Sequence, residues 1–286
     1  MQIFVSTTFN DDTADLDFLL GELKKLDIDG VEIGSTHKYK QNYVEIIKKC
    51  WQGRLVTHNF FPPSKDPNFF VNIASEDLDH RLESVKFAKN CLQTANLLGA
   101  EIYTIHPGFL ANPQSSSLKG SDNYDMQFSN QRVSRKRAFS NMSKSLEDLI
   151  LFSQDLEVKL AIETEGSATK PGISLMEDYS EYEELFSIFG DSIKLNLNLA
   201  HTSFAAKIYN YSLSDFIDAF YNWIIAAEIS HNDGLSDQHA SLIEDSYVFD
   251  HLNKLPDIPL ILEFRNASML DIRASIFLMR RHQNKD

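Results

Sequence analysis

Short apolar segments alternate with longer amphipathic segments along the whole chain. Apolar runs of this length, bounded by polar residues and glycine, are typical of buried β-strands. Eight strands are predicted, at residues 2–7, 30–34, 54–58, 101–106, 158–163, 193–198, 223–230 and 258–264.

The amphipathic segments repeat their apolar residues at helical spacing. They predict helices at residues 15–26, 43–51, 76–99, 133–156, 180–189, 213–221 and 269–281, with a weaker pattern at 243–253. Strands that alternate with helices form βαβ units and a parallel sheet. We therefore expect a single α/β domain over residues 1–286, a (β/α)₈ TIM barrel. A doubly wound open sheet is the alternative, but no phosphate-binding glycine loop follows the first strand.

Three long connections follow strands rather than helices, at residues 59–75, 107–130 and 164–179. In a (β/α)₈ barrel the connections after the strands lie on the face where active sites are built. We expect these loops to cover a site. Their aromatic residues either wall a pocket or pack within the loops; they include Phe60, Phe61, Phe69 and Phe70.

The composition narrows the class of protein further. A formal net charge of −14 works against nucleic-acid binding, which needs clustered basic residues. The one basic cluster, Arg132, Arg135, Lys136 and Arg137, is interpreted as a solvated helix face. Two cysteines do not make a disulfide framework. No apolar run approaches the ~20 residues of a membrane span. The first residues resemble a strand rather than a signal peptide. We expect a cytoplasmic protein.

Polar residues cluster where the predicted strands end. Five of the nine histidines lie at or just beyond a strand's carboxyl end, together with several carboxylates. The set comprises Glu32, His58, His106, Glu163, Asn198, His201, Glu228, His231, Asp233, Asp237, His239 and Glu263. Converging carboxylates repel one another unless cations compensate their charge. A divalent metal resolves this, and mixed imidazole and carboxylate ligands suit Zn, Mn, Fe or Co.

These residues give the chain a resemblance to the xylose isomerase-like barrels, which include sugar isomerases, sugar 3-epimerases and the endonuclease IV class of abasic-site nucleases. The resemblance covers essentially the whole chain. It is carried by GVEIG (30–34), THNFFPP (57–63), TIHPGF (104–109), LAIETEG (160–166), NLAH (198–201), EISHNDGLSDQH (228–239) and LILEF (260–264). The HNFFPP and HPGF segments look most like sugar isomerase-like proteins associated with surface-polysaccharide synthesis.

For the isomerases and epimerases, the resemblance implies one metal held by Glu, Asp, His and Glu from strands five to eight. Glu163 and Glu263 match this set, whereas Asn198 stands at the Asp position and Glu228 at the His position. The formal charge of the set is unchanged, so the two departures compensate each other.

For the nuclease branch, the resemblance implies further ligands for additional zinc ions. His58 and His106 with Glu163 match one site. His201, Asp237 and His239 match another, which makes more than one metal a reasonable expectation. The predicted metal ligands are thus Glu163, Asn198, His201, Glu228, Asp237, His239 and Glu263.

The leading hypothesis is a metal-dependent isomerase or epimerase of a sugar or sugar phosphate, in which Glu163 and Glu263 remove and return a proton through an enediolate. His58 or His106 would orient substrate oxygens, and Arg265 would pair with a phosphate or carboxylate. Zn, Mn or Co would be the cofactor, and a homo-oligomer is compatible with the sequence. Two alternatives stay open: a metal-dependent phosphodiesterase, and a non-catalytic sugar-binding barrel.

Overall fold

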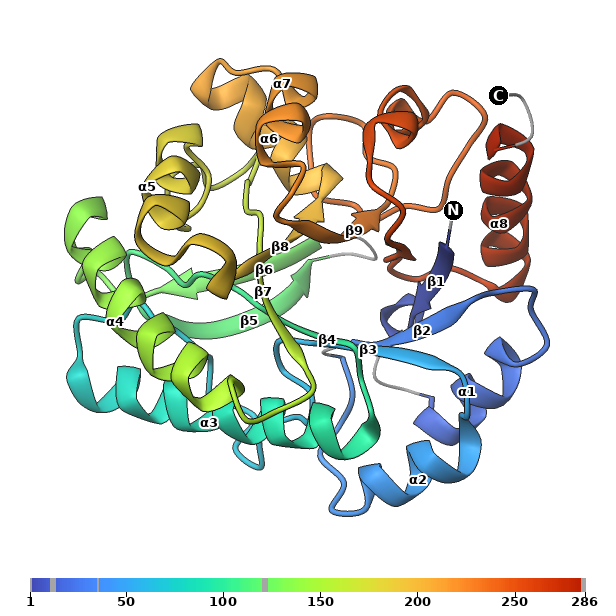
Figure 1. Ribbon diagram of the computed structural model, residues 1–286, viewed down its shortest axis with the longest axis horizontal. Coiled ribbons are helices and arrows are strands. Elements are labelled where there is room, and N and C mark those ends of the chain that lie inside the picture. The colour runs from blue at the N-terminus through green and yellow to red at the C-terminus, as the bar shows by residue number, and fades with distance from the viewer. Residues whose placement is uncertain (1, 11–13, 35, 120–122, 284–286) are drawn as a thin grey trace.

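Eight parallel strands close into a barrel in a computed structural model that describes residues 2–10, 14–34, 36–119 and 123–283. Around the barrel the strands follow the order β1-β10-β9-β8-β7-β4-β3-β2, and helices surround them (Figure 1). The strands are β1 (Gln2–Ser6), β2 (Gly30–Ile33), β3 (Arg54–His58), β4 (Ile102–Ile105), β7 (Lys159–Glu163), β8 (Lys194–Asn198), β9 (Ile224–Ile229) and β10 (Pro259–Leu262). All eight predicted strands are present, and the predicted TIM barrel is confirmed.

The barrel interior changes from apolar to polar along the strands. A small cluster of buried side chains fills its lower half: Phe4, Val56, Ile102, Ala161, Ala226 and Ile261. Side chains two positions further along a strand point the same way, and there the chain carries His58, Glu163, Glu228 and Glu263. Gly30 makes room for this core, because a Cβ at that position would lie 2.2 Å from the Phe4 ring. A packed apolar cluster therefore lies beneath the polar side chains at the carboxyl ends of the strands.

Helices cover the outside of the barrel. They are α1 (Leu16–Leu23), α2 (Tyr43–Cys50), α3 (Leu78–Leu98), α4 (Arg135–Ser153), α5 (Tyr179–Phe189), α6 (Leu199–Tyr209), α7 (Leu213–Phe220) and α8 (Met269–Gln283). The sequence pattern missed α6, which starts directly after β8. The weak pattern at 243–253 corresponds to two short 3₁₀ helices, Tyr247–Asp250 and Leu252–Lys254. None of the described helices is long and apolar enough to cross a membrane.

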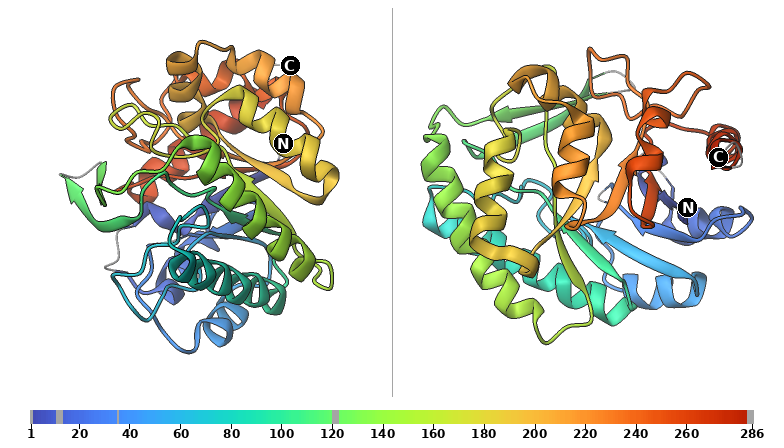
Figure 2. Two further views of the ribbon diagram at one scale, coloured as in Figure 1. Left: turned by 90° about the vertical axis from the view of Figure 1, so that its left-hand side faces the viewer. Right: turned by 45° about the horizontal axis from the view of Figure 1, so that its top comes forward.

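The second long connection contains a hairpin where only a loop was expected. Strands β5 (Pro113–Lys119) and β6 (Asn123–Phe128) pair antiparallel and project from the side of the barrel (Figure 2). The hairpin's base is attached to the third long connection, because Lys170 donates to the carbonyl of Met126.

The aromatic residues of the first long connection pack within the fold. Phe61 is fully buried and meets the Tyr43 ring at 5.1 Å between centroids. Phe60 and Phe69 both contact Phe87 of α3. Phe60 and Phe61 therefore pack within the fold, whereas Phe69 also lines an open surface pocket beside α3.

The basic cluster is not uniformly solvated, which corrects the interpretation as a solvated helix face. Arg135 is half-buried and donates to both carboxylate oxygens of Glu181, at 3.0 and 3.1 Å. It also donates to the carbonyl of Ser174, at 2.9 Å. Lys136 and Arg137 are exposed, as expected. Arg135 therefore fastens the third long connection to α4.

Candidate metal and active site

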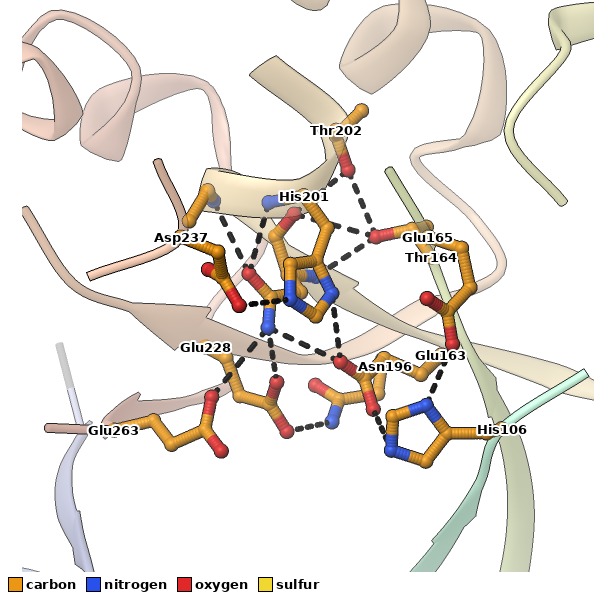
Figure 3. Close-up of polar contacts among 12 residues, drawn as sticks. His106, Glu163, Thr164, Glu165, Asn196, His201, Thr202, Glu228, Asp237 and Glu263 are labelled. Carbon is orange, nitrogen blue, oxygen red and sulfur yellow. Dashed lines mark hydrogen bonds and ion pairs between the residues drawn. The ribbon is translucent and has the colours of Figure 1, made fainter. Parts of the chain in front are cut away.

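The polar residues at the strand ends converge on one opening of the barrel. Figure 3 shows the carboxylates of Glu163, Glu228 and Glu263 gathered below His201 and Asp237. Glu163, Glu228 and His58 belong to strands, whereas Glu263 directly follows β10. All four side chains are buried. The barrel has therefore collected several ionisable groups in a region largely shielded from water.

Glu163 lies at the centre of this set. Its Oε2 lies 2.7 Å from Nε2 of His58 and 3.2 Å from Nε2 of His106, and its Oε1 lies 3.2 Å from Nδ1 of His201. Burial alone would raise the pKa of Glu163. The charges and hydrogen bonds of the surrounding imidazoles outweigh burial and hold the pKa well below its usual value. These contacts therefore favour the ionised form of Glu163.

His58, His106 and Glu163 form the first of two metal-ready groups, named here the first triad. Their ligand atoms all lie within 4.8 Å of one another. Nδ1 of His106 lies 2.5 Å from Oε1 of Glu165, which orients the ring so that Nε2 faces Glu163. A second carboxylate that orients an imidazole in this way is common around protein-bound metals.

His201, Asp237 and His239 form the second triad, whose ligand atoms also lie within 4.8 Å of one another. Nε2 of His239 is 3.1 Å from Asp237 Oδ2, and Nε2 of His201 is 3.5 Å from the same oxygen. Burial would raise the pKa of Asp237, but the two histidines hold it well below its usual value.

The loop that carries Asp237 and His239 of the second triad is held in a defined shape. Its two ends are joined by a pair of hydrogen bonds between the backbones of His231 and Ala240, at 2.8 and 2.9 Å. His239 adopts a left-handed backbone conformation with φ of 47°, which is uncommon outside glycine. This turn directs Asp237 and His239 toward His201.

Both triads fit a divalent metal in their donor chemistry. Each offers two imidazole nitrogens and a carboxylate, a combination found in zinc sites. The identity of the metal does not follow from these donors, because several transition metals share them.

The residues between the triads are arranged differently. Nδ2 of Asn198 lies 2.7 Å from Glu228 Oε2, 3.1 Å from Glu163 Oε1 and 3.4 Å from Glu263 Oε2. Its Oδ1 faces away and accepts hydrogen bonds from the backbone nitrogens of Ala200 and His201. The NH₂ group of the Asn198 side chain, rather than its oxygen, therefore points at the carboxylates.

Glu228 and Glu263 have opposite electrostatic surroundings. Burial, followed by the charges of Glu163 and Glu263, raises the pKa of Glu228 well above its usual value. For Glu263, burial is outweighed by His239, which lowers the pKa of that carboxyl to about 2. These surroundings thus favour the ionised form of Glu163 and Glu263 and the neutral form of Glu228.

The other predicted residues lie at the edge of the site. Nη1 of Arg265 is 3.7 Å from Asp237 Oδ2, beside the second triad. Asp233 is exposed and bonded within its own loop, and His231 contacts the Tyr247 ring. The latter two do not join either triad.

Glu165 and Asn196 also belong to the site and were not predicted, whereas Glu32 was already in the set of polar residues at the strand ends. Glu165 orients His106, and Asn196 donates to Glu228 Oε1 at 2.6 Å. Glu32 is fully buried, and burial raises its pKa to about 7 against the lowering effect of His58. Asn196 lies two positions before Asn198, so the strand period of two could have identified it.

Known structures share this fold. A D-tagatose 3-epimerase-like protein superposes with a TM-score of 0.72 at 18% identity, covering 99% of this chain and 97% of its own. D-psicose 3-epimerase from Clostridium cellulolyticum H10 gives 0.67 at 11% identity, with 99% of both chains covered. Endonuclease IV from Thermus thermophilus gives 0.65 at 16% identity, with 100% of both covered. At such identities the likeness concerns the fold.

No sequence of a curated protein matches the chain. The family model described as xylose isomerase-like TIM barrel, in contrast, matches residues 20–282. This match covers most of the chain and agrees with the barrel and its ring of histidines and carboxylates. The chain therefore belongs to the xylose isomerase-like TIM barrel family.

Proposed function

We propose that this chain is a metal-dependent isomerase or epimerase of a sugar or sugar phosphate. The observation that carries the proposal is the pair of buried carboxyl groups of Glu163 and Glu263. Both lie within hydrogen-bond distance of the same Asn198 amide, at 3.1 and 3.4 Å, so they face a common space at the barrel mouth. Proton removal and return at one carbon needs an acid–base group on each side of it.

In this mechanism Glu163 and Glu263 exchange roles as base and acid. The pKa of each is held low, by the imidazoles around Glu163 and by His239 beside Glu263. One carboxylate takes the proton from the carbon next to a carbonyl, which gives an enediolate. For epimerisation the other carboxylate must first have taken up a proton from solvent, which it then returns on the opposite face. For isomerisation the first carboxylate returns the same proton to the neighbouring carbon.

The remaining residues would hold metal and orient the substrate. The second triad, and the first, are the groups that would hold a divalent ion such as Zn, Mn or Co. A bound metal would supply Lewis-acid stabilisation of negative charge on substrate oxygens. His106 would orient a sugar hydroxyl, and Arg265, which is partly exposed, would pair with a phosphate or carboxylate. The fold shared with sugar 3-epimerases supports a sugar as substrate.

The test is proton exchange at a sugar carbon. Metal-loaded protein is incubated in D₂O with a panel of ketoses, aldoses and their phosphates, and deuterium incorporation is followed by NMR. Exchange in the wild type and its loss in Glu163→Gln support the proposal. The matched control is Asp233→Asn, which changes an exposed carboxylate near the site and should leave exchange intact. Exchange that persists in Glu163→Gln would overturn the assigned role.

A metal-dependent phosphodiesterase is the second candidate. The compact second triad favours it, because clustered metals activate water for attack on phosphate esters. Zinc-dependent hydrolysis of bis(4-nitrophenyl) phosphate or of abasic DNA, without any sugar proton exchange, would replace the first proposal by this one.

A further inference from the structure

We propose that the Asn198 amide excludes a metal ion from the space between Glu163, Glu228 and Glu263. The chain would then bind metal only at the two flanking triads. This proposal concerns metal occupancy, and it does not depend on which reaction the protein performs.

Three buried carboxylates that share one space need positive charge or hydrogen-bond donors between them. A metal ion is one solution, and the NH₂ group of an amide is another. Nδ2 of Asn198 has all three carboxylates within 3.4 Å, with the shortest distance, 2.7 Å, to Glu228. The amide therefore already lies where a shared cation would have to bind.

The orientation of this amide is fixed from the other side by helix α6. Asn198 is the N-cap of α6, and its Oδ1 accepts from the backbone nitrogens of Ala200 and His201, at 3.1 and 3.2 Å. A turned amide would put NH₂ against two N–H donors and its oxygen against carboxylates. An amide NH₂ only donates hydrogen bonds, so the group facing the carboxylates cannot serve as a metal ligand.

Glu228 is held by amides on both oxygens. Oε2 accepts from Asn198, and Oε1 accepts from Asn196 at 2.6 Å. Asn196 is itself positioned by a hydrogen bond to Thr104 Oγ1 at 3.2 Å. A metal that recruited Glu228 would have to displace at least one of these donors and leave it unpaired in a buried place, which is costly.

The exclusion of metal then depends on one atom, Nδ2 of Asn198. An aspartate at position 198 would keep one oxygen on the cap of α6 and turn the other, in place of the NH₂ group, toward the three carboxylates. Four carboxyl groups would then share one buried space without the donor that lies between them in the wild type, which favours a bound cation. Asn198→Asp should therefore create a metal site that the wild type does not have.

The experiment counts bound zinc in the full chain. Wild type and Asn198→Asp are expressed with zinc present, stripped with chelator, titrated with ZnCl₂, and analysed for tightly bound zinc per chain. We expect at most two ions in the wild type and one more in Asn198→Asp. The matched control is Asn232→Asp, the same change at a buried loop residue that bonds Tyr247 and Gly234; its count should equal that of the wild type.

Three zinc ions in the wild type, or an unchanged count in folded Asn198→Asp, would overturn the proposal. An equal gain in Asn232→Asp would also overturn it, because the extra ion would then follow charge alone. If Asn198→Asp does not fold, anomalous scattering from zinc-soaked wild-type crystals decides instead. Zinc density at the triads alone supports the proposal, and density between Glu163, Glu228 and Glu263 contradicts it.

Discussion

Nδ1 of His239 lies 2.9 Å from Oε2 of Glu263, while Nε2 of the same ring faces Asp237 at 3.1 Å. One imidazole therefore joins the second triad to a carboxylate of the proposed acid–base pair. His239 is the main influence that lowers the pKa of Glu263. A change in the charge or position of the His239 ring, such as metal binding at the second triad, should therefore change the pKa of Glu263. Metal binding and the protonation of Glu263 should be coupled in this protein.

Zinc should stabilise the metal-stripped chain through the second triad. A ligand that binds only the folded state contributes about 2.7 kcal/mol at a hundredfold excess over its Kd. Asp237→Asn removes a charged ligand and should reduce the zinc-induced rise in Tm. Thermal melts with ZnCl₂ and with EDTA measure this rise. Asp233→Asn, on the same loop but exposed, should retain the rise. An equal rise in Asp237→Asn would show that the second triad is not a metal site.

Asn198→Ala should destabilise the protein more than the loss of an ordinary helix cap. Loss of the cap on α6 costs about 1 kcal/mol. The three carboxylates also lose a buried donor, which costs a further ~1–3 kcal/mol. Urea unfolding of metal-free protein measures the total.

The control for this prediction is Ser134→Ala, which removes the cap of α4. Ser134 accepts a hydrogen bond from the backbone nitrogen of Arg137 and is exposed, so only the capping contribution is lost. Similar losses in the two variants would show that the amide of Asn198 does little for the carboxylates.

The strands could be predicted because each one buries short apolar runs with a polar residue at its carboxyl end. Helix α6 was missed because Asn198 ends β8 and caps the helix at once, so no loop separates the two elements. The β5–β6 hairpin was missed because β5 is serine-rich and polar, although β6 does alternate polar residues with Tyr124, Met126 and Phe128.

The strand-end pattern indicated which polar residues would converge, and the resemblance to the xylose isomerase-like barrels implied their division into the two triads. The sequence did not indicate how the amide of Asn198 is oriented. That orientation depends on two backbone N–H groups of α6, a helix that the sequence pattern did not predict. The sequence thus predicted that Asn198 lies in the site, whereas the local backbone structure determines which of its side-chain atoms faces the carboxylates.

Stability should fall in acid because of His37, which is buried and whose Nε2 lies 2.8 Å from Thr7 Oγ1. Burial lowers the pKa of His37 from 6.5 to about 4, with a smaller contribution from Lys40. The unfolded chain therefore takes up a proton near pH 6.5 that the folded chain refuses until about pH 4. The associated stability is present above pH 6.5 and is lost as the pH falls toward 4, by at most about 3 kcal/mol.

His37→Gln keeps a polar side chain that does not titrate in this range. Urea unfolding at about pH 7 and about pH 4.5 measures the loss for each protein. Carboxylates with lowered pKa, such as Glu263, contribute equally to both proteins, so the difference isolates His37. The same acid loss in both proteins would contradict the prediction.

Arg135 should control the order of the third long connection. It donates to Glu181 and to the carbonyl of Ser174, and it also reaches the hydroxyl of Tyr209 at 3.1 Å. Arg135→Lys loses the forked geometry that serves these acceptors together, and the unpaired groups should cost about 1–3 kcal/mol.

The loss from Arg135→Lys should be local, because the affected acceptors surround the connection that carries Glu165, the residue that orients His106. Faster amide hydrogen exchange is therefore expected across residues 164–178, while the barrel strands stay protected. Lys136→Ala is the control, since Lys136 is the exposed neighbour and a surface change of this kind shifts stability by less than about 0.5 kcal/mol. Unchanged exchange in Arg135→Lys would mean that the connection is held by its other contacts, such as the hydrogen bonds of Glu177 to Gly172 and Ser174.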